Sequence, residues 1–149
     1  MDNLPTTITN LLFLLPISKA YHHNDYLTAS AISAVGTASF ISHLVENHKH
    51  GMPGMIDVSK NTSYFLNRLD IFGCVIVALR FGYIFITNWK RMRISRMEVI
   101  LTLSALICNM ASEYDKHNSR LKYCLYIPLH SIWHIMAAML MNTFLNKIY

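Results

Sequence analysis

The chain has 149 residues, of which 53% are hydrophobic and only 14% are charged, with a mean hydropathy of +0.30. Average soluble domains carry about a quarter charged residues, so this composition argues against an ordinary soluble domain and for a membrane protein. The net charge of +5 comes from basic residues in short clusters between apolar runs. This pattern excludes an extended nucleic-acid-binding face and suits anchoring beside a membrane.

Five apolar segments follow one another along the chain, separated by polar connections. A membrane-spanning helix needs roughly 20 apolar residues, and the segments are near this length. We therefore predict one all-α domain over residues 1–149, a polytopic transmembrane bundle that crosses the bilayer about five times. The expected spans are 4–20, 26–45, 67–89, 97–112 and 122–146.

The first two segments differ in character. Segment 4–20 contains Pro5 and Pro16, and no positively charged stretch precedes it, so a retained helix is expected and a cleaved signal peptide is the alternative. Segment 26–45 is rich in Ala, Ser, Gly and Thr. Small residues let helix backbones approach closely in lipid, so this helix is expected at the centre of the bundle.

An odd number of spans fixes which connections share a side of the membrane. Five spans place the N-terminus and the connections 46–63 and 113–122 on one side, here called face A. The other two connections and the C-terminus lie on the opposite side, face B. Lys and Arg are distributed almost equally over the two faces, so the positive-inside rule leaves the orientation open. The basic cluster 90–96 favours a cytosolic face B.

Ionisable residues inside spans are costly, by about 2.5–3.5 kcal/mol for Asp, Lys or Arg, and usually face the bundle interior and a function. Four of them fall in helix portions that lie toward face A. His43 is near the end of the second span, Asp70 is at the start of the third, and His130 and His134 are in the first half of the fifth. Arg80, farther along the third span, is expected to snorkel or to pair within the bundle.

These residues suit a zinc site. His130 and His134 are four residues apart, so their side chains share one helix face with a rise of about 5.4 Å between them. With His43 they make a three-histidine ligand set that leaves one position open, as in catalytic zinc sites. Asp70 is placed to orient or deprotonate a water nucleophile. Ser39, one turn before His43, is placed to hydrogen-bond the water, the substrate carbonyl or a developing oxyanion.

Each of these residues also has a purely structural explanation. A histidine pair at this spacing can arise from helix packing, and Ser39 can be a small helix contact. Asp70 can cap its helix or pair with Arg68, and His43 can be an interfacial residue near the motif "HKH" at 48–50, itself a candidate for a looser metal site. Their occurrence together at one depth of the membrane is what favours a shared site.

The order of these residues resembles a known group of membrane proteins, the CREST superfamily. The matching residues are Ser39 and His43 in "SFISH", Asp70 in "NRLDIFG", and His130 and His134 in "HSIWH". The superfamily includes alkaline ceramidases, the adiponectin and progestin receptors, the GPI-remodelling lipases of the Per family, and myomaker. The runs "SEYD" and "HSIWHIMAAML" look closest to the myomaker-like branch. Members have seven helices, so this chain resembles a form shortened by two.

The resemblance implies Zn2+ held by His43, His130 and His134, with Asp70 and Ser39 around the nucleophile. It implies a membrane-embedded hydrolase whose substrate is a lipid with an amide or ester bond, such as a ceramide. A non-enzymatic fusion, receptor or scaffold protein with a structural zinc is the alternative. A metal or proton transporter is a third, opposed by the gathering of the polar groups at one face. Five helices leave room for a homodimer that completes the pocket wall.

Overall fold

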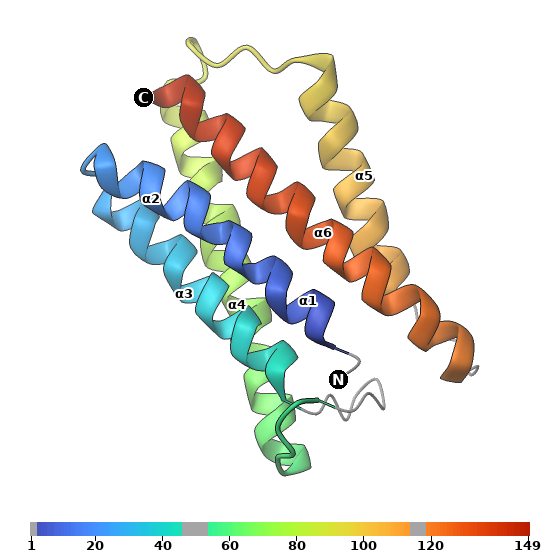
Figure 1. The fold of residues 1–149 in the computed structure, drawn as a ribbon. Coiled ribbons are helices and arrows are strands. Elements are labelled where there is room, and N and C mark those ends of the chain that lie inside the picture. The colour runs from blue at the N-terminus through green and yellow to red at the C-terminus, as the bar shows by residue number, and fades with distance from the viewer. Residues whose placement is uncertain (1–2, 46–53, 114–118) are drawn as a thin grey trace.

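The computed structural model describes residues 3–45, 54–113 and 119–149, and its described elements are all helical. The first three elements follow each other without a break and are called the N-terminal rod below. With the four later helices they make five rods that alternate in direction (Figure 1). The predicted all-α class and the five helical segments are confirmed. The elements are α1 Leu4–Thr9, η1 Asn10–Phe13, α2 Leu14–His22, α3 Tyr26–Leu44, α4 Lys60–Asn88, α5 Arg96–Glu113 and α6 Ser119–Ile148.

Local capping signals explain where several helices begin. The Asp25 side chain caps α3 by accepting a hydrogen bond from the Thr28 backbone N–H at 3.1 Å. Ser59 caps α4 in the same way, so this helix begins at Lys60, before the predicted span that starts at residue 67. At the start of α5, Ser95 and Glu98 form a capping box, each side chain bonded to the backbone N–H of the other.

Two prolines of the described residues, Pro16 and Pro128, lie in the interior of helical rods, beyond the first turn. Proline removes one backbone hydrogen bond and its ring crowds the carbonyl four residues earlier. Ahead of Pro16 the rod tightens into the 3₁₀ segment η1, which accommodates this crowding and keeps the rod continuous. Pro128 lies within α6, one turn before the helix portion that carries Ser131 and His134.

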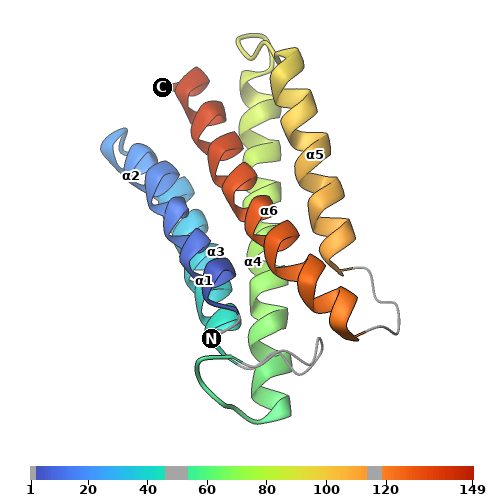
Figure 2. The ribbon, with the colours of Figure 1, turned by 45° about the vertical axis from the view of Figure 1, so that its right-hand side comes forward.

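The N-terminal rod is packed between α3 and α6 (Figures 1 and 2). Helix α4 packs along α3 and α5 packs along α6, and α4 also meets α6 through the rings of Phe81 and Phe144, whose centroids are 5.3 Å apart. The sequence places α3 at the centre, and α3 indeed packs on both α4 and the N-terminal rod. The buried core lies where the N-terminal rod meets its two neighbours. Its main members are Phe13, Ala20, Ile32, Ala138 and Leu145.

Small residues allow α3 to approach its neighbours closely. A Cβ atom at Gly73 of α4 would lie 3.0 Å from the Cα and Cβ atoms of Val35, so only glycine fits this contact. Gly36 of α3 lies against Phe13, where an added Cβ atom would be 3.4 Å from the Phe13 Cβ atom and 3.5 Å from its ring. The Gly73 contact holds α4 close to α3, the pair of helices that carry Asp70 and His43, and the Gly36 contact holds α3 close to the N-terminal rod.

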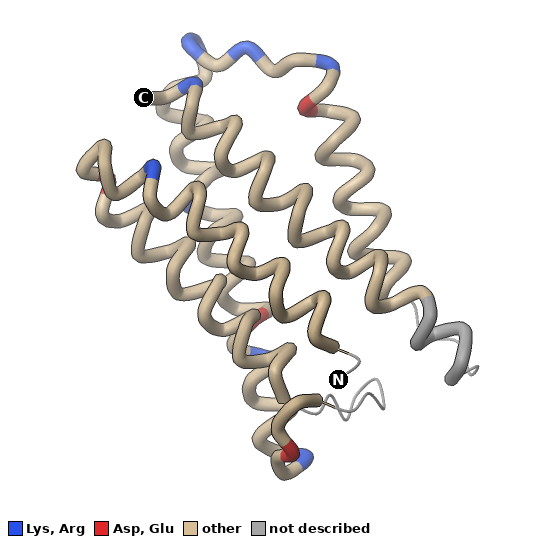
Figure 3. Tube along the Cα trace, viewed as in Figure 1, with Lys and Arg blue, Asp and Glu red and all other residues tan. Residues whose placement is uncertain are grey.

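Among the described helices, α3 and α4 are long and apolar enough to cross a membrane. Most Lys, Arg, Asp and Glu residues lie near the ends of the rods, while the middle stretches are largely uncharged (Figure 3). The starts of α1, α4 and α6 and the ends of α3 and α5 lie at the same end of the bundle (Figure 1). This is the end that the sequence assigns to face A.

Candidate metal centre

Three histidines from two helices meet in the interior of the bundle. His43 comes from the last turn of α3, and His130 and His134 come from successive turns of α6. The ring centroids of His43 and His130 are 4.8 Å apart, and those of His43 and His134 are 5.1 Å apart. The exposed fractions of the three residues are 2%, 7% and 2%. A chain folded in this way buries a histidine triad that can hold a metal ion.

The donor set fits zinc in chemistry and in size. One ring nitrogen from each histidine lies within 4.8 Å of the other two. A point equidistant from three nitrogens at this spacing is about 2.8 Å from each, whereas Zn–N bonds are about 2.0–2.1 Å long. Each ring therefore needs to move inward by less than about 1 Å. Rotation about the side-chain torsions can supply a movement of this size without displacing a helix.

The outer nitrogen of His130 is held by a serine of α5. The Ser112 hydroxyl lies 3.1 Å from Nδ1 of His130 and donates its own hydrogen to the Asn109 carbonyl at 2.7 Å. Because a hydroxyl has one hydrogen, Ser112 Oγ accepts from His130, and Nδ1 carries the proton. In this tautomer the lone pair is on Nε2, the atom that a metal would take as its ligand.

The outer nitrogen of His134 is held by the N-terminal rod. Nδ1 of His134 lies 3.2 Å from the Thr6 carbonyl oxygen and 3.1 Å from the Thr9 hydroxyl, which itself donates to the Thr6 carbonyl. A carbonyl oxygen only accepts, so Nδ1 of His134 is the donor and Nε2 again has the lone pair. Hydrogen-bonded outer nitrogens of this kind are the usual companions of metal-binding histidines.

Aromatic rings fix the planes of the two α6 imidazoles. Tyr126, one turn before His130 and 1% exposed, stacks on the His130 ring with centroids 4.8 Å apart and planes 20° apart. Phe13 of the N-terminal rod lies beside His134 at a centroid distance of 6.1 Å. The histidine rings are thus restrained by packing as well as by hydrogen bonds.

Asp70 and Ser39 lie beside the triad. Oδ2 of Asp70, on α4, is 3.9 Å from Nε2 of His43. The Ser39 hydroxyl, one turn before His43 on α3, hydrogen-bonds the Asp70 carboxyl, and both residues are buried. The structure therefore brings together all five residues that the sequence assigned to the site. Their catalytic roles remain predictions.

The sequence reasoning missed five residues beside the imidazoles: Thr6, Thr9, Phe13, Ser112 and Tyr126. A local signal existed only for Tyr126, which precedes His130 by one helical turn. Ser112 belongs to the "SEYD" run, but only the packing of α5 on α6 gives it a role. The "HKH" motif, a candidate for a second metal site, lies outside the described residues.

Arg80 is paired at the other end of the bundle. Its Nη2 atom donates to both carboxyl oxygens of Asp25 at 2.9 and 3.1 Å, and its Nε atom donates to Thr28 Oγ1 at 2.8 Å. Tyr149 also donates to Asp25, at 2.9 Å. Burial alone would raise the pKa of Asp25, but the Thr28 and Tyr149 hydrogen bonds and the Arg80 charge together lower it. This cluster ties the C-terminus to the turn between α2 and α3.

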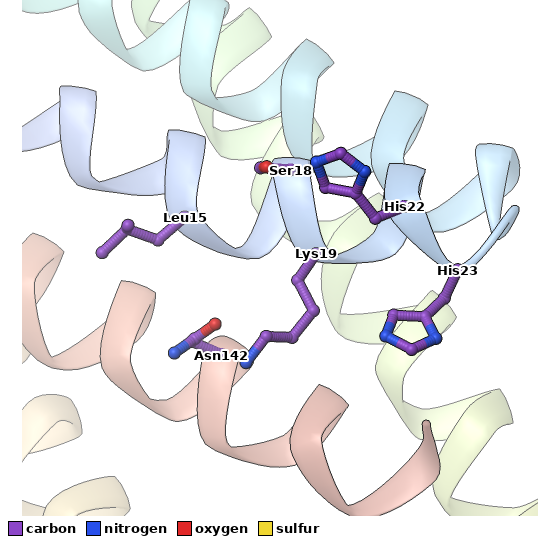
Figure 4. A pocket seen from close by; sticks show the side chains of 6 residues that line it. All are labelled: Leu15, Ser18, Lys19, His22, His23 and Asn142. Atoms are coloured by element: carbon purple, nitrogen blue, oxygen red, sulfur yellow. The ribbon is translucent and has the colours of Figure 1, made fainter.

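An open hollow of about 430 Å³ lies between α2 and α6, toward face B (Figure 4). It is lined by Leu15, Ser18, Lys19, His22, His23 and Asn142. Two of its lining side chains already have partners within the protein. Lys19 donates a hydrogen bond to Asn146, and the His23 ring stacks on the Tyr149 ring with centroids 4.4 Å apart. It is also at the far end of α6 from the triad, and we do not assign the function to it.

The fold and the site define an all-α protein with a buried histidine triad able to hold a metal ion. The chain belongs to the same family as "Uncharacterized protein L282" of Acanthamoeba polyphaga mimivirus, to which it is 40% identical over 155 aligned residues that cover 99% of each chain. No family model matches the chain, and no solved structure matches it.

Proposed function

We propose that this protein is a membrane-embedded, zinc-dependent hydrolase of CREST type that cleaves an amide or ester bond in a lipid, as a ceramidase does. One observation carries the proposal. Three buried imidazoles converge with the outer nitrogens of two of them occupied, beside the carboxyl group of Asp70. Such an arrangement presents inward-facing lone pairs to a cation and leaves one side of it to a nucleophile and a substrate.

The distribution of apolar side chains supports a bundle in lipid. Soluble monomers rarely expose large contiguous apolar patches. Here α4 and α5 expose a row of large apolar side chains along most of their length, while hydroxyl, amide and imidazole groups lie inside the bundle. The exposed residues include Phe65, Phe72, Val75, Leu79, Tyr83 and Ile86 on α4 and Val99, Ile100, Leu103, Ile107 and Met110 on α5.

Zinc, when bound, polarises a substrate carbonyl and lowers the pKa of water to about 7, so that a nucleophile is available at neutral pH. His43, His130 and His134 would hold it. The Asp70 carboxylate, which is 3.9 Å from His43, would take the proton from the attacking water, and the Ser39 hydrogen bond would orient this carboxylate. As the C–N or C–O bond breaks, Asp70 returns the proton to the leaving nitrogen or oxygen.

The test measures two properties of the protein purified in detergent: its zinc content and its rate of hydrolysis of a lipid amide or ester such as a ceramide. We expect about one zinc per chain in the wild type, and loss of both zinc and activity in His130→Ala. Asp70→Asn should keep the zinc and lose at least about 100-fold in activity, because general acid–base groups contribute about 10²–10⁴-fold. His22→Ala, an exposed histidine outside the triad, is the matched control. Full activity of the metal-free protein would refute the proposal.

A non-enzymatic protein with a structural zinc is the second candidate, and the burial of the triad favours it. His43 and His134 are each 2% exposed, as in closed structural sites. In that case zinc ties α3 to α6, His134→Ala destabilises the fold, and Asp70→Asn and Ser39→Ala leave function unchanged. Lipid hydrolysis that requires an intact Asp70 would exclude this candidate.

A further inference from the structure

The first two turns of the N-terminal rod place polar side chains inward. Asn3, Thr6, Thr7 and Asn10 recur at the spacing of one helix face, and they are 1%, 0%, 2% and 3% exposed. Soluble amphipathic helices show the opposite pattern, with the apolar face buried. We call these four residues the polar stripe. The residues on the opposite side of the rod are apolar and more than half exposed: Ile8, Leu11, Leu14 and Leu15.

The polar stripe lies against the metal centre. Thr6 contacts α6 twice, through its carbonyl oxygen to His134 and through its hydroxyl to Ser131 Oγ at 3.3 Å. The N-terminal rod and α6 run in the same direction (Figure 1). Asn3 therefore lies about one turn nearer face A than Thr6, and Asn10 lies about one turn deeper. Because Thr6 is level with Ser131 and His134, the stripe runs alongside the triad.

Three side-chain atoms of the stripe have no hydrogen-bond partner within the described part of the chain. They are Nδ2 and Oδ1 of Asn3 and Oδ1 of Asn10. The remaining groups are satisfied, since Asn10 Nδ2 donates to the Thr6 carbonyl and the Thr7 hydroxyl donates to the Asn3 carbonyl. Buried polar atoms without a partner are rare, and such atoms usually meet water or a ligand. Asn3 thus offers an amide NH2 and an amide oxygen, one helical turn from the Thr6 carbonyl that contacts His134.

We infer that the polar stripe is the subsite for the uncharged polar head of a lipid, with Asn3 as the residue that selects it. The inference rests on the function proposed above. Residues 3–13 contain no charged side chain, so the stripe has nothing to neutralise a phosphate. Nδ2 of Asn3 donates to a carbonyl or hydroxyl oxygen of the head, and Oδ1 accepts from its N–H or O–H. A head without a donor would leave Oδ1 unpaired, which lowers affinity.

The test measures binding rather than turnover, so that it does not depend on catalysis. The Asp70→Asn protein, with zinc and after chelation, is titrated with three single-chain lipids of equal length. These are N-dodecanoylethanolamine, which has donors and acceptors, methyl dodecanoate, which has no donor, and dodecyl phosphate, which is anionic. We expect N-dodecanoylethanolamine to bind about tenfold more tightly than methyl dodecanoate. This is the loss of affinity expected when one buried polar group, here Oδ1 of Asn3, is left without a hydrogen-bond partner.

Asn3→Leu removes the amide with little change in shape, and it should abolish the tenfold preference. It should not lower the melting temperature, because it removes buried polar atoms that have no protein partner. Asn61→Leu, at an exposed position in the first turn of α4, should keep the preference. If Asn3→Leu fails to fold, Asn10→Leu tests the same subsite. It should also reduce the preference for N-dodecanoylethanolamine over methyl dodecanoate.

An unchanged preference in folded Asn3→Leu, or tighter binding of dodecyl phosphate than of the amide, would overturn the inference. Failure of the proposed function looks different. If the protein is no hydrolase but the stripe binds the amide lipid, the tenfold preference persists and no product is formed. If it is a hydrolase without this subsite, wild-type activity is present and the three lipids bind alike.

Discussion

Replacement of Ser112 by alanine tests whether the outer hydrogen bond of His130 prepares this ring to bind a metal. The Ser112 hydroxyl accepts from Nδ1 of His130 at 3.1 Å and so favours the tautomer with a lone pair on Nε2. Alanine keeps the helix and removes the acceptor. The zinc affinity of the Ser112→Ala protein should therefore fall, while its fold and its three imidazoles remain in place.

The size of this effect follows from the neighbours of His130. Loss of an outer-shell partner typically costs 10–100-fold in metal affinity, about 1.4–2.7 kcal/mol. Oε1 of Glu113 lies 3.9 Å from the same Nδ1 atom and can take over part of the hydrogen bond. We therefore expect about a tenfold loss for Ser112→Ala and about 100-fold for the double variant with Glu113→Ala.

The assay is competition for zinc against a fluorescent chelator, with each variant in the same detergent. Ser104→Ala, a half-buried serine of the same helix, is the matched control and should bind zinc like the wild type. Ser112→Thr keeps a hydroxyl and should restore most of the affinity. The reasoning is refuted if Ser112→Ala binds zinc within twofold of the wild type while His130→Ala loses it.

Three further predictions concern stability. Gly73→Ala should lower the free energy of unfolding by about 1–3 kcal/mol, because the added Cβ would lie 3.0 Å from Val35. Gly82→Ala is the control: its added Cβ has no atom within 4 Å, so it should leave the stability unchanged or raise it by up to about 1 kcal/mol. Thermal unfolding checks this, and equal effects at the two positions would contradict the close contact of α3 with α4. Asp25→Ala should cost about 1–3 kcal/mol at pH 7 through the lost helix cap and ion pair, and Asp25→Asn less, because asparagine still caps. The pKa of Asp25 is lower in the folded protein than its usual value of 3.8, so the charge of Asp25 stabilises the fold above that pH. The difference in stability between the wild type and Asp25→Asn should therefore disappear as the pH falls through the pKa of Asp25 in the folded protein. A difference in stability that persists in acid would argue against the ion pair. Chelation should lower the melting temperature of the wild type but not that of His134→Ala, and equal shifts would show that the triad holds no stabilising metal.

The number and type of the helical segments could be predicted from the sequence because their signals are local. Apolar runs, polar connections and capping residues such as Asp25 and Ser95 all act within a few residues. The predicted span begins at residue 67, whereas α4 begins at Lys60. Residues 60–63 are polar, so a rule based on apolar runs omits them, although Ser59 caps a helix there.

The pairing of His130 with His134 also follows from local geometry, since a spacing of four places both on one helix face. Placing His43 and Asp70 at the same depth needed only the number of spans and the direction of each. Neither argument gives distances. That the rings of α3 and α6 meet at centroid distances of 4.8–5.1 Å depends on the packing of whole helices.

By itself, then, the sequence determined the helical class, the alternation of the rods and the residues gathered near one end, because helical periodicity and hydropathy are properties of short segments. Only the tertiary structure decided that the N-terminal rod enters between α3 and α6, where it supplies the Thr6 carbonyl to His134 and buries Asn3. The same holds for Ser112 and His130, which contact each other only through the packing of α5 on α6. Contacts between residues more than 100 positions apart depend on how helix surfaces fit together, and no short pattern in the chain encodes that fit.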